Sequence, residues 1–101
     1  MFSVKLHSSG GDVVLAGCDR EILGSILTEG ELQVEVSERF YGGDVVSRDQ
    51  LLSHIEEATI INIMGNRIVD FAIEEGLVQS KNVRKIGGVK HAQIVTIPKE
   101  R

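Results

Sequence analysis

The sequence predicts an α+β fold, a two-layer sandwich in which a mostly antiparallel sheet carries two principal helices on one face. Three observations lead to this fold class. Several short segments alternate apolar and polar residues with the period of two that is typical of half-buried strands. Two longer segments place apolar residues at helical spacing. The regular strand–helix alternation of a doubly wound sheet is absent, and 101 residues suffice for a single domain, 1–101.

The first half of the chain is expected to begin with a hairpin. Residues 2–7 alternate in polarity, and a glycine-rich turn separates them from the apolar run 13–16. Asp19 stands where it can cap a short helix over residues 20–23. The clearest strand covers residues 32–36, and its polar outer face is typical of a sheet covered on one side only.

The second half is expected to supply both principal helices and the last strand. Ser47 and Gln50 have the spacing of a capping box and predict a helix that begins after Ser47. The apolar run 59–64 is either a buried strand or an extension of a neighbouring helix, because periodicity does not separate these alternatives over so short a run. The second helix is expected over residues 66–75, followed by a glycine in the left-handed conformation. The last strand is expected over residues 92–97.

The composition favours a cytoplasmic protein without a metal or a cofactor. The N-terminus lacks the charged start and apolar run of a signal peptide, and no segment approaches the roughly 20 apolar residues that span a bilayer. The one cysteine excludes an internal disulfide. Cys18 and the three histidines lack zinc-ligand spacing. We expect a buried thiol rather than a nucleophile, because free cysteine is among the most buried residue types.

Charge divides the chain into an acidic body and a basic tail. Residues 1–79 carry 5 Lys and Arg against 14 Asp and Glu, whereas residues 80–101 carry 6 against 1. Two adjacent glycines in the tail are flanked by cations, which suits an anion held by backbone N–H groups. The alternative is a glycine turn between two strands, with solvated lysines. The candidate anion- or RNA-binding residues of this tail are Lys81, Arg84, Lys85, Gly87, Gly88, Lys90 and His91.

A second set of residues is the candidate for an adjacent surface. A predicted loop holds Tyr41, Gly42 and Gly43, where the ring can stack on an unpaired base and the glycines allow close backbone approach. The alternative is that the aromatic residues of this loop belong to the core. Asn62 and Gly65 flank the start of the second helix. Free N–H groups there attract an anion, or these two residues form an ordinary cap and turn.

Four ordered segments of the chain resemble a known family. They read CDREILG at 18–24, EGEL followed by VSERFYGG within 29–43, NIMG followed by AIEEGLV within 62–78, and NV followed by IGGVKHAQ within 82–93. In order and spacing they are similar to an archaeal family catalogued as domain of unknown function number four hundred and twenty-four. The resemblance covers nearly the whole chain. It implies an archaeal source, a small α/β fold and, from the gene neighbourhood of the family, a role near translation.

These observations favour a non-enzymatic binding module over an enzyme. Its expected partner is RNA or a ribonucleoprotein, contacted through residues 81–93, and no membrane partner is expected. A second hypothesis is a protein-interaction or assembly subunit whose acidic body meets a basic protein. The third is an enzyme on a small phosphorylated metabolite, with His91 as acid and base. A single deep pocket lined by His91, Asn62 and Tyr41 would favour this third hypothesis.

Overall fold

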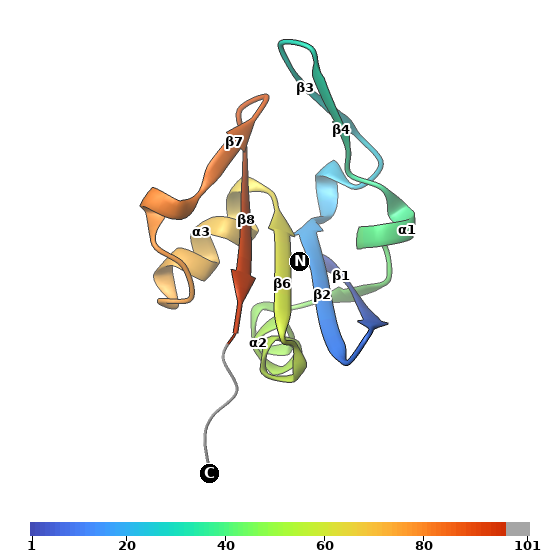
Figure 1. The fold of residues 1–101 in the computed structure, drawn as a ribbon, viewed down its shortest axis with the longest axis vertical. Coiled ribbons are helices and arrows are strands. Elements are labelled where there is room, and N and C mark those ends of the chain that lie inside the picture. The colour runs from blue at the N-terminus through green and yellow to red at the C-terminus, as the bar shows by residue number, and fades with distance from the viewer. Residues whose placement is uncertain (97–101) are drawn as a thin grey trace.

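The computed structural model describes residues 1–96, which form one six-stranded sheet and a separate two-stranded hairpin (Figure 1). The order of strands across the large sheet is β5-β1-β2-β6-β8-β7. The hairpin pairs β3 with β4. The eight strands are β1 (Phe2–Ser9), β2 (Asp12–Asp19), β3 (Ile26–Glu29), β4 (Leu32–Glu35), β5 (Asp44–Val46), β6 (Ile60–Met64), β7 (Arg84–Ile86) and β8 (Val89–Val95).

The predicted α+β class and the mostly antiparallel sheet are confirmed. Every neighbouring pair of strands in the large sheet is antiparallel except β2 and β6, which run parallel from Val14 opposite Ile60 to Cys18 opposite Met64. The ambiguous run 59–64 is therefore a strand, and it lies near the centre of the sheet. Ile61, Ile63 and Met64 of this strand are buried, whereas Ile60 and Asn62 are half-buried.

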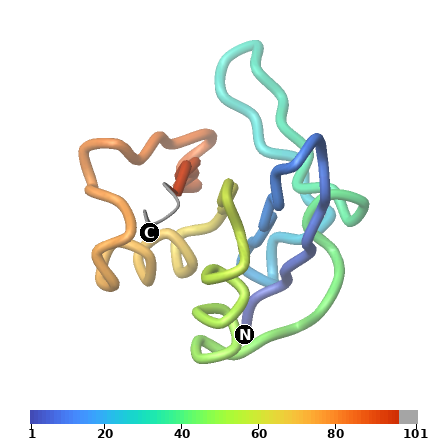
Figure 2. The backbone as a smooth tube through the Cα atoms, turned by 60° about the horizontal axis from the view of Figure 1, so that its bottom comes forward, coloured from blue at the N-terminus to red at the C-terminus, as the bar shows by residue number. Residues whose placement is uncertain are grey.

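The helices α2 (Arg48–Glu57) and α3 (Asn66–Glu74) pack on one face of the sheet, called here the helix face. Both bonds of the predicted capping box at Ser47 are present. Alternate strand residues such as Leu15, Ile61 and Ile63 join the apolar sides of both helices in one buried cluster. In Figure 2, α2 and α3 lie along the lower part of the view, whereas the β3–β4 hairpin projects at the top.

The opposite side of the sheet, called here the second face, is covered only in part. The strand residues between those of the helix face, among them Ala16, Cys18 and Met64, form a second buried cluster with Val36 and Tyr41. The covering elements are the short helix α1 (Glu38–Tyr41) and the β3–β4 hairpin. The predicted two-layer sandwich therefore describes only the sheet and the helices α2 and α3, because α1 and the β3–β4 hairpin cover part of the other face.

Several local predictions need correction. Residues 20–22 form a 3₁₀ turn, η1 (Arg20–Ile22), and the Asp19 side chain does not cap it. The predicted loop around Tyr41 contains α1, because the Ser37 hydroxyl accepts the N–H of Phe40 and starts a helical turn. Strand β3 was not expected. A second 3₁₀ turn, η2 (Ser80–Asn82), precedes β7. Strand β8 begins three residues before the predicted strand 92–97, whose last residue lies outside the described part of the chain.

Within residues 1–96, no helix has the length and apolar character that a membrane crossing requires.

Candidate functional site

A polar network at the middle of the second face joins three distant parts of the chain. The Tyr41 hydroxyl donates a hydrogen bond to Asn62 Oδ1 over 2.8 Å. His91 Nε2 lies 3.1 Å from the same oxygen and donates to it, because an amide oxygen can only accept. Tyr41 comes from α1, Asn62 from β6 and His91 from β8. The fold thus joins His91 of the basic tail to Tyr41 and Asn62 of the adjacent surface, the three residues that the enzyme hypothesis names together.

The two titratable groups of this network are uncharged at neutral pH. Burial, with a smaller contribution from the Cys18 thiol, raises the pKa of Tyr41 to about 12. Burial, and then the positive charge of Arg84, lowers the pKa of His91 below its ordinary value of 6.5. Removing a group from water disfavours its charged form. The phenol therefore stays a donor, and the imidazole carries one hydrogen, at Nε2.

Two more polar residues flank the network on the same face. Arg84 lies directly opposite His91 across the β7–β8 pair, and Gln93 lies directly opposite Asn62 across the β6–β8 pair. Directly paired residues project from the same side of a sheet. Both Arg84 and Gln93 are exposed. One continuous polar area is therefore formed by Arg84, His91, Asn62 and Gln93, and it is called here the polar patch. Figure 1 shows the ribbons of β6 and β8, which carry three of these residues, unobstructed.

The remaining cations of the basic tail do not all join this patch. Lys90 projects to the helix face, where its Nζ makes a 2.6 Å ion pair with Asp70 of α3. Its backbone N–H donates to Asn66 Oδ1, so α3 holds Lys90 twice. Lys85 lies opposite Lys90 and so projects to that side as well. Lys81 is exposed in η2.

The paired glycines form a tight turn between β7 and β8, as the simpler interpretation predicts, and the turn holds a carboxylate of the chain itself. The N–H of Gly87 donates to Glu29 Oε1 over 2.9 Å. Gly87 has φ +56° and its missing Cβ would lie 2.6 Å from the carbonyl oxygen of Thr28, so a larger residue does not fit. The tip of the β3–β4 hairpin is thereby fastened to the β7–β8 turn.

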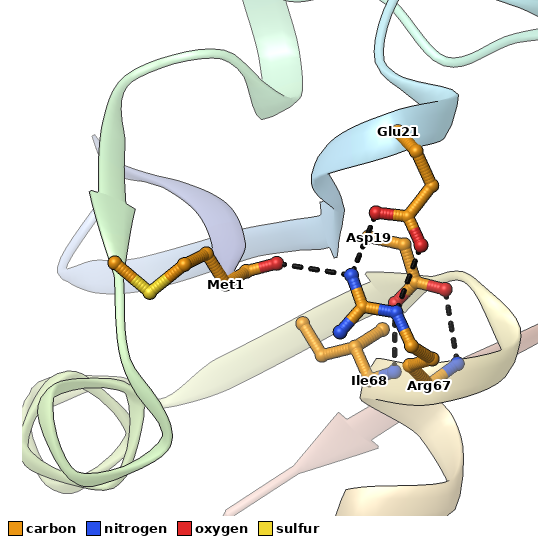
Figure 3. A network of polar contacts seen from close by, with 5 residues as sticks. All are labelled: Met1, Asp19, Glu21, Arg67 and Ile68. Atoms are coloured by element: carbon orange, nitrogen blue, oxygen red, sulfur yellow. Dashed lines mark hydrogen bonds and ion pairs between the residues drawn. The ribbon is translucent and has the colours of Figure 1, made fainter.

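The N–H groups at the start of α3 also bind a carboxylate of the chain itself (Figure 3). The two carboxylate oxygens of Asp19, at the end of β2, accept the backbone N–H groups of Arg67 and Ile68 over 2.9 and 2.8 Å. Asp19 is only 4% exposed. Gly65 has φ +135°, and a Cβ there would lie 2.5 Å from the Asp19 carboxyl carbon. The N–H groups that were expected to attract an external anion therefore already bind Asp19.

An ion pair extends this arrangement to the N-terminus. The Arg67 guanidinium binds both oxygens of Glu21 over 2.8 and 2.6 Å and also donates to the Met1 carbonyl (Figure 3). The hydrogen bond from Arg67 is the main reason that the pKa of Glu21 falls to about 2. This network ties β1, η1 and α3 together at the end of the sheet.

Gly42 and Gly43 serve packing and lie apart from the polar patch. A side chain at Gly42 would meet the backbone of Glu38, and one at Gly43 would meet the backbone of Val4. Phe40 stacks on His7, with ring centroids 4.9 Å apart. Tyr41 itself is 5% exposed, so its ring belongs to the core while its hydroxyl reaches Asn62. The alternative that placed this ring in the core is therefore confirmed, and the ring is not exposed for stacking on a base.

The chemistry of the other candidates is limited. Cys18 is buried, and burial with the nearby charges of Asp19 and Glu21 raises its thiol pKa to about 12. Among the described residues, no three His, Cys, Asp or Glu side chains gather as a metal site would require. Two hollows of about 200 and 330 Å³ are lined by residues near Asp44 and near Leu77. Neither hollow is lined by Tyr41, Asn62 or His91, so neither supports the enzyme hypothesis.

Sequence reasoning missed the internal roles of Asp19 and Glu29. Their partners lie 48 and 58 residues away, so no local spacing pointed to them. The sequence feature that could have indicated these two contacts is a glycine that needs positive φ, with free backbone N–H groups nearby. Such a site binds a carboxylate of the protein as readily as a ligand.

The comparisons with known proteins identify the family. The family model described as "Protein of unknown function (DUF424)" matches residues 7–97, and the chain belongs to this family, as its four segments predict. A crystal structure of an uncharacterized conserved protein from Methanopyrus kandleri is similar over 99% of this chain and 95% of that one. The two share 29% sequence identity with a TM-score of 0.84, so they share a fold. No curated protein matches the chain.

Proposed function

We propose that this member of the DUF424 family is a non-enzymatic binding module that holds RNA on the polar patch of its second face. One observation carries the proposal: Arg84, His91, Asn62 and Gln93 stand in adjacent registers of the sheet, with Arg84 and Gln93 exposed and Asn62 and His91 half-buried. Flat sheet faces with polar and cationic side chains suit single-stranded nucleic acid, whose bases and phosphates are both accessible.

Charge supports the same surface. Lys81, Arg84 and Lys85 are exposed, and no ion pair joins any of them to a carboxylate within residues 1–96. All three lie on or just before β7, the edge strand of the sheet. Arg84 projects to the second face with the patch, whereas Lys85 projects to the helix face at the same edge. The rest of the chain is strongly acidic and repels phosphate, so an RNA strand is directed to this edge. Lys90 makes a smaller contribution, because Asp70 already neutralises it.

The groups in the patch are suited to binding rather than to bond cleavage. Tyr41 and His91 are uncharged at neutral pH and hydrogen-bonded to an amide. The Cys18 thiol is buried, and its raised pKa keeps it protonated. A catalytic site would need a nucleophile, its base and a group that orients the base.

The test is fluorescence anisotropy with tRNA and ribosomal RNA fragments at several salt concentrations. We expect the logarithm of the affinity to fall linearly with the logarithm of the salt concentration, because phosphate contacts release counterions. The double variant Arg84→Glu, Lys85→Glu should weaken binding at low salt and reduce the slope by about 2.

Arg20→Glu is the matched control, because Arg20 is an exposed cation of η1. It should leave the affinity near that of the wild type. Absence of binding at low salt, or equal losses in the control and the double variant, contradicts the proposal.

A protein partner of basic character is the second candidate, and a separate observation favours it. The β3–β4 hairpin exposes Ile26, directly opposite Glu35 on one side, and Leu32, directly opposite Glu29 on the other side. Exposed apolar side chains rimmed by charges of one sign are typical of a contact with a partner of the opposite sign. If a basic protein binds here, it should co-purify with the wild type and be lost from an Ile26→Lys, Leu32→Lys variant, whose RNA affinity is unchanged.

A further inference from the structure

We infer that Asn62 and His91 read the hydrogen-bonding edge of a single nucleobase while Arg84 binds the neighbouring phosphate. The inference rests on the proposed function, since it concerns the same surface. It goes further, because phosphate contacts alone recognise RNA without regard to sequence, whereas this site selects among bases.

The first step is that the Asn62 side chain has a fixed orientation. Its Oδ1 accepts from Tyr41 and from His91, which uses both lone pairs of the oxygen. The amide group is planar, so its Nδ2 points in a set direction with two N–H donors. Within residues 1–96, Nδ2 donates to no protein group, and no buried side-chain nitrogen or oxygen there lacks a partner. The Nδ2 group is therefore open to solvent.

The second step is that His91 offers the complementary group. Its Nε2 donates to Asn62, so in the neutral ring Nδ1 carries a lone pair and accepts. No hydrogen bond within the described chain uses Nδ1. Burial and the charge of Arg84 keep the ring neutral at pH 7, which keeps Nδ1 an acceptor.

A donor and an acceptor on neighbouring side chains match a ligand edge with the same two groups in the opposite order. Nucleobases present such edges, for example the amino group and ring nitrogen of adenine. A peptide group also has one donor and one acceptor. The exposed guanidinium of Arg84, directly opposite His91, favours the nucleobase, since it makes a bidentate, charge-assisted pair with the two oxygens of a phosphate, whereas a neutral peptide offers it only uncharged carbonyl oxygens.

The hydroxyl of Tyr41 has a positioning role in this arrangement. Its pKa of about 12 means that it stays protonated and holds Asn62 Oδ1 at every pH of interest. Gln93, opposite Asn62, adds an exposed amide at the border of the site. The recognising groups are thus held by side chains from α1, β6 and β8 before any ligand arrives.

The test compares four homopolymeric RNA hexamers, one for each base, by anisotropy at one salt concentration with the full chain. We expect wild-type affinities that differ by roughly tenfold between the best and the worst base. Asn62→Asp keeps the oxygen that binds Tyr41 and His91 but replaces the free amide by a second oxygen. It should therefore change the ranking of the four bases.

Arg84→Gln supplies the contrast. It should weaken all four hexamers by a similar factor and lower the salt slope by about 1, without changing the ranking. A second readout is the side-chain amide signal of Asn62 in ¹⁵N NMR, which should shift on addition of the preferred hexamer. The same spectra should show hydrogen on Nε2 of His91 and none on Nδ1.

Four results overturn the inference, and they distinguish its failure from that of the proposed function. Equal affinity for the four hexamers with an ordinary salt slope, or a ranking that Asn62→Asp leaves unchanged, removes base recognition and leaves RNA binding in place. Absence of binding by every hexamer at low salt removes both. Binding of a blocked dipeptide amide that shifts the Asn62 signal, with no shift from RNA, assigns the site to a peptide instead.

Discussion

The two faces of the sheet use neighbouring residues of the same strands for different purposes. On the helix face, Ile61 is 1% exposed and lies in a cluster closed by α2 and α3. One position further along β6, Asn62 faces the other way and takes part in a half-buried polar network. The helix face is completed within the chain, whereas the second face keeps donors, acceptors and a cation without internal partners. This contrast indicates that the helix face stabilises the fold, and it is the basis of the proposal that a ligand binds to the second face.

The largest expected effect comes from the helix face. Ile61→Ala should lower the free energy of unfolding by about 3 kcal/mol, because it removes buried methyl groups and leaves a cavity beneath α2 and α3. Urea denaturation followed by circular dichroism measures this change. A loss below about 1 kcal/mol would show that the helix layer is loosely packed and would break the contrast.

The next largest effect concerns the start of α3. Asp19→Ala should cost about 2 kcal/mol, since two N–H groups lose a buried carboxylate partner. Asp19→Asn keeps one acceptor oxygen and should cost less. If the two variants unfold at the same urea concentration as the wild type, Asp19 is not the cap that stabilises α3.

A smaller change in stability is expected on the second face. Asn62→Ala should cost about 1 kcal/mol, because Tyr41 and His91 lose a partner in a half-buried place that water can reach. It should nevertheless change the preference among RNA bases more than any helix-face variant does. The contrast between the faces fails if Asn62→Ala destabilises the protein as much as Ile61→Ala.

The smallest effect is a dependence of stability on pH. The pKa of His91 is lower in the folded protein than its ordinary value of 6.5, so the unfolded chain binds a proton more readily. Stability should therefore decline as the pH falls from 7 to 5, and His91→Gln should make this part of the pH profile flatter. Urea midpoints measured at both pH values give the slope; a steeper profile in the variant contradicts the assignment.

The sequence predicted the fold class, both principal helices, the capping box of α2 and the left-handed glycine after α3, because these depend on local spacing. The capping box at Ser47 and the left-handed Gly76 after α3 both occur as expected. Contacts between residues far apart in the chain could not be predicted from local spacing. Asp19 was assigned to the adjacent turn, whereas its carboxylate reaches α3 across the sheet. Strand β3 escaped notice since only Leu27 among its residues is half-buried, so its polarity hardly alternates.

The candidate site was predicted in pieces rather than as a whole. Tyr41 and Asn62 were assigned to one surface and His91 to another, and the three were named together only as the lining of a deep pocket. The hydrogen bonds that join them depend on strand pairing and on α1. The glycine turn was predicted, but the carboxylate that binds its N–H group was not. That carboxylate belongs to Glu29 of the β3–β4 hairpin, of which only one strand was expected. Gly42 and Gly43 were candidates because glycine permits close approach of a ligand to the backbone. In the structure, other backbone segments of the same chain pack closely against them.

The most direct test of the contrast between the two faces is a ¹H–¹⁵N NMR titration of the wild type with the RNA hexamer that binds best. We predict that the backbone amide signals of β6, β7 and β8 around Asn62, Arg84 and His91 shift. The amide signals of α2, and of the part of α3 that does not contact β8, should stay in place. Shifts concentrated on α2 and α3, or no shifts at concentrations that saturate the anisotropy signal, would contradict the assignment of binding to the second face.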